Sequence, residues 1–372
     1  MVSSRTRRRG PPRWLLILLI LLLVAPMVAA IWPAAQPAST QPALPVATRL
    51  AEGTYRLSGI PGQLLLRGQT VFFTASSTPS VASQRIYALD LDTGQVREVL
   101  GNRFYGDGLL DSYRLGLAGD WLIYLEVSAG DNGRSWTLVR HNLATGETAV
   151  IDQARDDQAG WPGPEVAADG DWVVWVRKEA AEGGTRSVIR AYSVATGETK
   201  QLGPALDATQ EAWSWPNLQG GRLVVERDVS QPEQTSSVHL IDLRTGEVTA
   251  IPAPAPATEP ALAGGYIVWK GALRYAPGPL VVYDLSSQKA RTLDLQAEYP
   301  RSNGELVVAW VKGSGLVRVD PATGDHQPLA GDDASGFRPG QEVALDGGRA
   351  AWIEWAVPEQ GQVQARLRVS QP

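Results

Sequence analysis

The stretch Asp169-Gly170-Asp171-Trp172-Val173-Val174-Trp175 places a glycine turn directly before an apolar strand, and versions of it recur along the chain. The recurring turn glycines are Gly68, Gly119, Gly170, Gly221, Gly264, Gly304 and Gly348. The first three intervals between them are 51 residues each, and the next three are 43, 40 and 44 residues. Recurrence at this spacing predicts a repeat architecture.

Each repeat divides into four short apolar runs bounded by Gly, Asp, Asn or Pro, which is the signature of β-strands. In the third repeat the expected strands are 165–168, 172–177, 188–194 and 198–202. A Thr-Gly turn follows the third strand of most repeats, because a tight hairpin places one residue at positive φ. The residue before five of these turns can accept hydrogen bonds from the turn amides. These residues are Asp90, Asn142, Asp242, Asp284 and Asp320.

The last repeat has three expected strands, at 342–346, 349–356 and 363–369, and lacks a fourth. Residues 52–59 precede the first repeat and are similar to a fourth strand such as 198–203. Pairing of these two segments would close the repeats into a ring without open edges. We therefore predict an all-β fold: a seven-bladed β-propeller with four-stranded blades, in which an N-terminal strand completes the last blade. Six or eight blades are the alternatives.

An uncharged apolar run, residues 14–30, follows five arginines near the N-terminus. This arrangement predicts either a signal peptide or a single N-terminal membrane helix whose N-terminus stays in the cytoplasm. Residues 33–48 are rich in Pro, Ala, Gln, Ser and Thr, a composition that predicts an extended linker. The expected organisation is a leader or anchor over 1–32, a linker over 33–48 and an extracytoplasmic propeller over 49–372.

Without residues 1–30 the chain has 29 basic and 39 acidic residues, so it repels the phosphate backbone of nucleic acids. It contains no cysteine, which excludes disulfides, thiolate metal sites and cysteine nucleophiles. The three histidines, His141, His239 and His326, belong to different repeats, and no Gly-x-Ser-x-Gly motif is present. The sequence thus predicts no catalytic residue, no metal ion and no cofactor, and it favours a monomeric propeller.

The segment from Pro164 to Gly170, followed by the apolar strand and the Thr-Gly-Glu turn, resembles the WD-like propeller repeats of the TolB type. The resemblance covers roughly residues 50 to 372. The Ser-Pro-Asp-Gly core of that repeat is kept in part, as Ala168-Asp169-Gly170 and Leu345-Asp346-Gly347. The resemblance implies a periplasmic or extracellular propeller that binds a protein without catalysis.

The connections between successive repeats are rich in aromatic and charged residues. In a propeller they lead toward the central channel, where aromatic rings with a few polar groups are the usual composition of a binding site. The candidate binding residues are Tyr113, Arg114, Trp161, Trp213, Trp215, Glu259, Tyr299, Arg301, Phe337 and Arg338. The alternative is that these aromatic residues pack between blades. Packing is the role that we expect for the tryptophans of the second strands, which are Trp121, Trp172, Trp175, Trp269, Trp310 and Trp352.

Two functions stay open at the level of sequence. The first is a non-catalytic extracytoplasmic propeller, tethered to or secreted across the membrane, that binds a protein or glycan at the cell envelope. The second is an extracytoplasmic carbohydrate-active enzyme, a lyase or hydrolase, with its site in the propeller channel. Two channel carboxylates at the spacing of a glycosidase pair, about 5–5.5 or 6.5–9.5 Å, would favour the enzyme.

Overall fold

The computed structural model describes residues 45–58, 60–76, 85–100, 109–130, 133–155, 163–230, 234–254, 256–274, 276–332, 336–356 and 364–370. They belong to one compact unit, Leu44–Pro372, and every helix or strand assigned among them is a β-strand. Within these ranges no helix is long and apolar enough to span a bilayer. The expected leader and residues 33–44 of the expected linker lie outside the described residues.

The described strands pair into six antiparallel sheets, four of which have four strands each. The first of these four contains β3 (Ile60–Arg67), β4 (Thr70–Ser76), β5 (Arg85–Asp90) and β6 (Val96–Leu100). The second contains β7 (Leu109–Ala118), β8 (Trp121–Gly130), β9 (Gly133–Asn142) and β10 (Thr148–Arg155). The third contains β11 (Glu165–Asp169), β12 (Trp172–Ala181), β13 (Gly184–Ser193) and β14 (Thr199–Asp207). The fourth contains β15 (Glu211–Gln219), β16 (Arg222–Val229), β17 (Thr235–Asp242) and β18 (Val248–Ala250).

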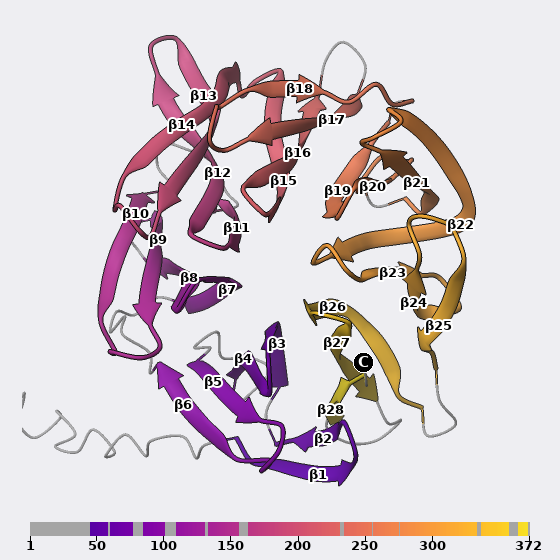
Figure 1. Ribbon diagram of the computed structural model, residues 1–372. Coiled ribbons are helices and arrows are strands. Elements are labelled where there is room, and N and C mark those ends of the chain that lie inside the picture. The colour runs from indigo at the N-terminus through magenta and orange to yellow at the C-terminus, as the bar shows by residue number, and fades with distance from the viewer. Residues whose placement is uncertain are drawn as a thin grey trace, which may run out of the picture. The chain divides into compact units, whose positions relative to one another are not determined.

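The other two sheets are larger. One has seven strands: β19 (Thr258–Ala263), β20 (Tyr266–Lys270), β21 (Gly278–Asp284), β22 (Lys289–Ser302), β23 (Val307–Val311), β24 (Gly315–Val319) and β25 (His326–Ala330). The last has five: β1 (Ala47–Ala51), β2 (Thr54–Leu57), β28 (Gln364–Val369), β27 (Arg349–Ala356) and β26 (Arg338–Asp346). In Figure 1 the six sheets surround a central axis, and β3, β7, β11, β15, β19, β26 and the last part of β22 lie nearest to it. The predicted all-β propeller architecture is therefore observed.

The long strand β22 joins two four-stranded modules into the seven-stranded sheet. Its first part pairs with β21, from Lys289 opposite Asp284 to Ala297 opposite Gly278. Its last part pairs with β23, from Ala297 opposite Val311 to Ser302 opposite Val307. One strand of 14 residues thus serves as the outer strand of one module and the inner strand of the next.

The two ends of the described chain meet in the five-stranded sheet. Strand β2 pairs with β28, with Thr54 opposite Arg368 and Leu57 opposite Ala365. This pairing is the predicted completion of the last repeat by an N-terminal strand. Strand β1 adds a further strand outside β2, and it begins at Ala47, inside the segment expected to be linker.

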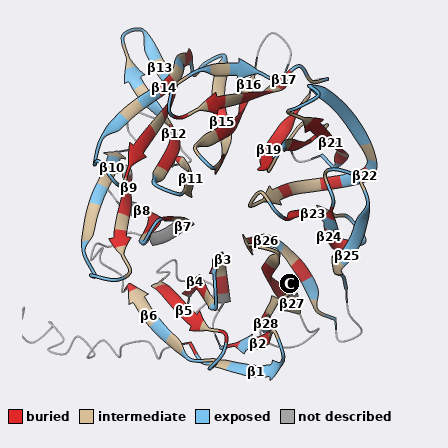
Figure 2. Cartoon of the chain, in the orientation of Figure 1, coloured by how far each residue is buried: buried red, intermediate tan, exposed pale blue. Residues whose placement is uncertain are grey.

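The hydrophobic core lies between neighbouring sheets (Figure 2). One cluster, for example, joins Ile123 and Leu125 of β8 to Val173 and Trp175 of β12. Trp175, Trp269 and Trp352 are buried, as expected for the second strands. The other three tryptophans of this group, Trp121, Trp172 and Trp310, are partly buried and pack against core clusters. Burial between sheets is what removes the apolar faces of the strands from water.

The polar residues before the hairpin turns accept hydrogen bonds from turn amides, as predicted. Asp90 accepts from the Thr93 amide at 2.8 Å, and Asn142 accepts from the Thr145 amide at 2.9 Å. Asp242, Asp284 and Asp320 make equivalent contacts. Hydrogen bonds from the hydroxyl and amide of Ser286 lower the pKa of Asp284 to about 2. These four carboxylates and the Asn142 amide oxygen stabilise the turns.

Candidate functional site

Three inner strands on one side of the channel carry the same backbone feature. Trp215 in β15, Glu259 in β19 and Tyr299 in β22 have φ angles of 51°, 56° and 52°. Each lies where the register of the inner strand shifts, which is a β-bulge. Each also precedes a proline, namely Pro216, Pro260 and Pro300. Residues before proline prefer extended conformations, so these three are held against their local preference at a cost of about 1–3 kcal/mol each.

A carboxylate from a neighbouring strand holds the amide of each bulge. Glu165 in β11 accepts a hydrogen bond from the Trp215 amide. Glu226 in β16 accepts from the Glu259 amide at 3.0 Å, and Glu259 in turn accepts from the Tyr299 amide at 2.8 Å. These hydrogen bonds satisfy the three amides and offset part of the backbone strain.

Glu259 also forms a buried ion pair with Lys270, the last residue of β20. The Lys270 Nζ to Glu259 Oε1 distance is 2.6 Å, and the two side chains are 1% and 2% exposed. One carboxylate oxygen of Glu259 therefore binds the ammonium group, while the other accepts the Tyr299 amide. Because it is paired and hydrogen-bonded, Glu259 can remain buried at this position.

Glu226 is buried as well, with 1% exposure, but its charge is less well compensated. The nearest described guanidinium nitrogen is Arg274 Nη2, 4.0 Å from Glu226 Oε1. Burial raises the pKa of Glu226 to about 7, against the lowering effects of the Glu259 amide and of Arg274. The negative charges of Asp228 and Glu165 add to the increase. Glu226 therefore changes charge near neutral pH.

Two aromatic rings and two guanidinium groups lie next to this buried network. The ring centroids of Trp215 and Tyr299 are 6.3 Å apart and inclined at 41°. The Cζ atoms of Arg274 and Arg301 lie 5.9 and 5.5 Å from the Trp215 ring centroid, within the range of cation–π attraction. All four side chains are partly exposed. We call the whole group the bulge cluster; its members are Trp215, Glu226, Glu259, Lys270, Arg274, Tyr299 and Arg301.

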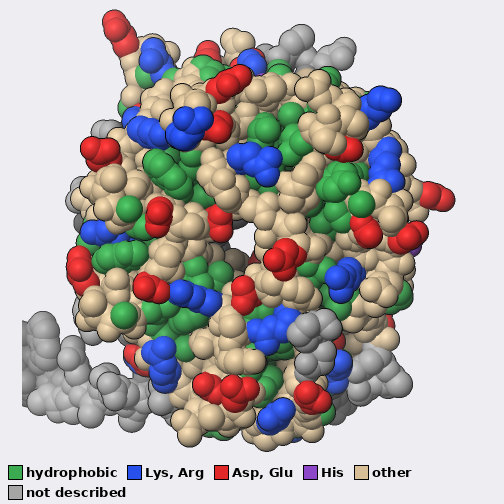
Figure 3. Space-filling view, viewed as in Figure 1, with side chains coloured by type: hydrophobic (Ala, Val, Ile, Leu, Met, Phe, Trp, Pro, Cys, Tyr) green, Lys and Arg blue, Asp and Glu red, His purple; other side chains and the backbone are tan. Residues whose placement is uncertain are grey.

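The bulge cluster adjoins the central channel. A cavity of about 480 Å³ is lined by residues of β3, β7, β11, β15, β22 and β26, and Arg301 and Pro216 are among them. Figure 3 shows the opening at the centre of the ring, with acidic and basic side chains around it. Arg301 therefore belongs both to the bulge cluster and to the lining of the cavity.

Four of the ten residues predicted from the sequence come together in this cluster: Trp215, Glu259, Tyr299 and Arg301. Trp213, two residues before Trp215, has its side chain in the core instead and is only 3% exposed. Its indole nitrogen donates a hydrogen bond to the carbonyl of Pro204 at 3.0 Å, and the ring meets His239 edge-on. Residues two apart on a regular strand lie on the same face, so the bulge between Ser214 and Asn217 accounts for the difference.

The remaining predicted residues lie elsewhere. Phe337 is covered by the guanidinium group of Arg366, whose Cζ is 4.1 Å from the ring centroid. Arg338 is mostly exposed and lies 3.5 Å from Asp332. Tyr113 and Arg114 belong to β7, next to its register shift, but their side chains are outside the described part. Trp161 lies outside the described residues altogether.

Sequence reasoning did not single out Glu226, Lys270 or Arg274. A signal for the first two was present, since each is a charged residue at the end of an apolar strand run, Leu223-Val224-Val225 and Ile267-Val268-Trp269. A charge in such a run is either exposed or paired inside the protein. Arg274 follows β20 in an irregular connection, where the sequence gives no comparable signal.

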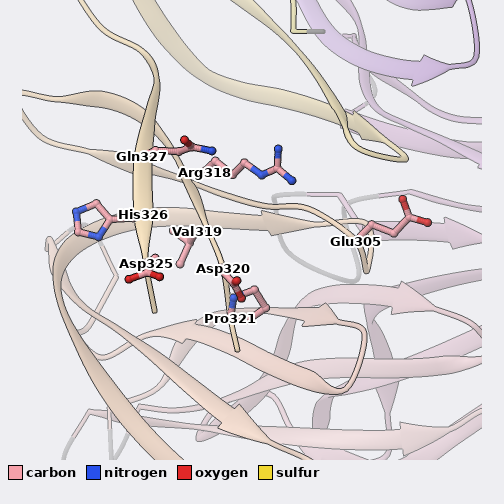
Figure 4. Close-up of a pocket in the computed structure, with 8 residues that line it drawn as sticks. All are labelled: Glu305, Arg318, Val319, Asp320, Pro321, Asp325, His326 and Gln327. Atoms are coloured by element: carbon pink, nitrogen blue, oxygen red, sulfur yellow. The ribbon is translucent and has the colours of Figure 1, made fainter. Parts of the chain in front are cut away.

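A second recess lies at the outer strands β24 and β25 (Figure 4). It has a volume of about 570 Å³, and Arg318, Asp320, Asp325 and His326 are among its lining residues. The Asp320 carboxylate accepts hydrogen bonds from the Ala322 and Thr323 amides, so it belongs to the turn. Across the described ranges, no three His, Asp or Glu side chains are grouped as a metal site. The bulge cluster is therefore the stronger candidate for function.

No family model matches the sequence, and no curated protein matches it. Solved structures do match. The β-propeller domain of the Trilobed protease from Pyrococcus furiosus aligns with a TM-score of 0.57 at 11% identity, over 80% of this chain and 90% of that domain. Puromycin hydrolase aligns with a TM-score of 0.55 at 15% identity, over 85% of this chain and 55% of the hydrolase. The acylaminoacyl peptidase of Pyrococcus horikoshii aligns with a TM-score of 0.54 at 13% identity, over 81% of this chain and 53% of the peptidase.

These similarities establish a β-propeller fold and nothing finer. The chain spans about half the length of the hydrolase and of the peptidase. TolB from Acinetobacter baumannii also aligns, at 14% identity over 82% of this chain and 65% of TolB, but with a TM-score of 0.42. The resemblance inferred from the repeats thus holds at the level of the propeller, and the TolB alignment adds no further argument.

Proposed function

We propose that this chain is a non-catalytic, extracytoplasmic β-propeller whose bulge cluster binds a protein or glycan partner at the cell envelope. The main support is the strained backbone at Trp215, Glu259 and Tyr299, held by carboxylates of which two, Glu226 and Glu259, are buried. Strained residues gather at ligand sites, where surrounding contacts fix a geometry that the backbone alone would not keep. The side chains that this backbone presents are two aromatic rings and guanidinium groups, which are enriched in binding hot spots.

The test is to replace Trp215 and Tyr299 by alanine together. Glu259 and Glu165 bind the backbone amides of these residues, so the buried network can persist in the variant. We expect the affinity for the envelope partner to fall at least about tenfold, since losing hot-spot aromatic residues costs about 2 kcal/mol or more. The partner is first captured from solubilised envelopes, identified, and then titrated in purified form against both proteins; a glycan array serves for a carbohydrate partner.

A matched control is Tyr266→Ala. Tyr266 is a partly buried aromatic residue at the start of β20, at the opposite end of that strand from Lys270. Its removal should leave the affinity unchanged. If the Trp215 and Tyr299 variant keeps its native circular dichroism spectrum and binds the partner as tightly as the unaltered protein, the bulge cluster is not the binding site.

A second candidate is the carbohydrate-active enzyme, a lyase or hydrolase. The observation that favours it is the pKa of Glu226, which at about 7 is suited to a general acid or base. Against it, Glu226 and Glu259 are 1% and 2% exposed and thus covered in this conformation. Release of reducing ends or unsaturated products from polysaccharides by the unaltered protein, but not by Glu226→Gln, would establish this activity in place of simple binding.

We further infer that the ring has seven blades. The seven-stranded sheet contains two modules that share β22, and the five-stranded sheet contains one module completed by β2. Together with the four separate sheets, these modules match the seven repeats of the sequence.

The arginine-flanked apolar run supports the extracytoplasmic location, and fractionation of cells followed by N-terminal sequencing would test both the location and the cleavage of residues 1–32.

A further inference from the structure

We propose that Arg274 and Arg301, placed beside the indole of Trp215, form a subsite for a carboxylate group of an acidic peptide segment. This inference rests on the proposed binding function and gives the chemical class of the ligand. The first support is the convergence of two guanidinium groups on one ring, at 5.9 and 5.5 Å from its centroid. Two positive charges near one ring make the local potential positive, and this potential attracts an anion.

The second support is the state of Arg274. Its side chain is 29% exposed, so a ligand can reach it, and its nearest acidic partner among the described residues is Glu226 at 4.0 Å. Its Nε atom is buried and has no hydrogen-bond partner. A buried donor without an acceptor costs free energy, so this guanidinium group is incompletely paired among the described residues, and its exposed part can bind a ligand carboxylate. Arginine is suited to this role because its planar fork can bind both oxygens of one carboxylate.

The third support is position. Arg301 lines the channel cavity, and Arg274, in the connection after β20, approaches the same Trp215 ring as Arg301. A peptide that ends in the channel, or that places an Asp or Glu side chain there, could meet both groups. The net negative charge of the protein opposes this only weakly, because charges farther away than about 8 Å are screened at physiological ionic strength.

The aromatic rings favour a peptide over a sugar. Sugar recognition by tryptophan or tyrosine requires a free ring face, but cations approach both rings of the cluster. Arg274 and Arg301 lie near Trp215, and Lys270 Nζ is 5.9 Å from the Tyr299 ring centroid. The rings therefore orient the cations, and recognition falls to the charged groups.

Glu226 sets the pH dependence of this subsite. The groups around its carboxylate are Arg274 at 4.0 Å, the Glu259 amide at 3.0 Å, and the negative charges of Asp228 and Glu165. Lys270 is paired with Glu259 and does not neutralise Glu226. When ionised, Glu226 competes with a ligand carboxylate for Arg274; when protonated, it releases that guanidinium group. A ligand carboxylate stays ionised between pH 6 and pH 8, so its affinity should rise as the pH falls across this range.

The experiment measures binding of a short oligo-glutamate peptide to the full chain by calorimetry, with oligo-glutamine and an oligogalacturonate as comparison probes. We expect oligo-glutamate to bind, and Arg274→Gln and Arg301→Gln each to weaken it by about tenfold. Arg244→Gln, in the exposed turn after β17, is the matched control and should bind like the unaltered protein. The affinity of the unaltered protein should increase several-fold from pH 8 to pH 6, and Glu226→Gln should remove this increase.

Three results would overturn the inference: no binding of oligo-glutamate, equal binding by the Arg274→Gln and Arg301→Gln variants, or a stronger, arginine-dependent preference for oligogalacturonate. The last would assign a glycan ligand instead. The proposed function is judged separately. If the envelope partner needs Trp215 and Tyr299 but oligo-glutamate does not compete with it, the subsite is wrong and the binding function stands. If the partner needs neither ring, the binding function itself fails.

Discussion

Glu259 connects three structural modules through one residue. Its amide contacts Glu226 of the preceding sheet, and its carboxylate contacts both Lys270 and the Tyr299 amide. Removing one member of a buried ion pair leaves an uncompensated charge, which costs about 3–5 kcal/mol. We expect Lys270→Met to lower the free energy of unfolding by this amount in urea denaturation.

The double variant Lys270→Met with Glu259→Gln should recover part of that loss, because no buried charge remains and the amide oxygen can still accept from Tyr299. Equal stability of the single and double variants would show that the ion pair is not the source of the effect.

Glu226 should make stability depend on pH. Its pKa is about 7 in the folded chain against 4.5 ordinarily, so the folded state retains a proton that the unfolded state has already lost. The resulting stabilisation is complete below the unfolded pKa and is lost as the pH rises through about 7. The shift corresponds to about 3 kcal/mol.

Urea denaturation at pH 5 and pH 8 provides the measurement. Between pH 5 and pH 8 the free energy of unfolding should fall by about 3 kcal/mol more in the unaltered protein than in Glu226→Gln. A pH dependence identical in both proteins would mean that Glu226 does not titrate near neutrality.

At the scale of single strands, the bulges and β22 explain why the site could be predicted only in part. Their place among the aromatic and charged residues of the connections between repeats marked Trp215, Glu259 and Tyr299 in the sequence. Their positive φ angles could not be foreseen, since a residue before proline favours an extended conformation. Glu226 and Lys270 could have been noticed as charges in apolar runs, but the sequence does not show their shared partner Glu259. It lies 33 residues from Glu226, in the next sheet, and 11 residues from Lys270, on the adjacent strand.

The turn between β1 and β2 offers a test of ring closure. Gly53 has a φ of 64°, and a Cβ atom placed on it would lie 2.4 Å from the carbonyl oxygen of Val369 in β28. The left-handed conformation alone costs a non-glycine residue about 1–2 kcal/mol. Because of the added clash, Gly53→Ala should lower the free energy of unfolding by more than this amount. Hydrogen exchange should speed up selectively in β2 and β28.

Gly94→Ala is the control, because Gly94 has a φ of 73° and no atom within 4 Å of the added Cβ. Equal destabilisation by the two substitutions would show that the contact between β2 and β28 contributes little to stability.

For the molecule as a whole, repetition made the fold predictable. The same pattern of strands and turns occurs in every repeat, so a strand that is ambiguous in one repeat can be assigned from the others. The missing fourth strand of the last repeat indicated how the ring closes. The site has no such support. It depends on departures from the repeat, and on contacts between repeats such as Trp215 with Tyr299, which a single sequence does not specify. The extra strand β1 was likewise missed, because proline-rich composition around it favoured a linker.

The pairing of β2 with β28 has a consequence for biosynthesis. Thr54 leaves the ribosome long before Arg368, its partner, and at about 5–20 residues per second the delay is on the order of tens of seconds. During this time the nascent chain carries an unfinished edge. Strand β2 has only four residues, one of them Arg56, and short charged strands resist pairing with other chains. Strand β2, which closes the ring, thus also resists pairing with other chains before β28 has been synthesised.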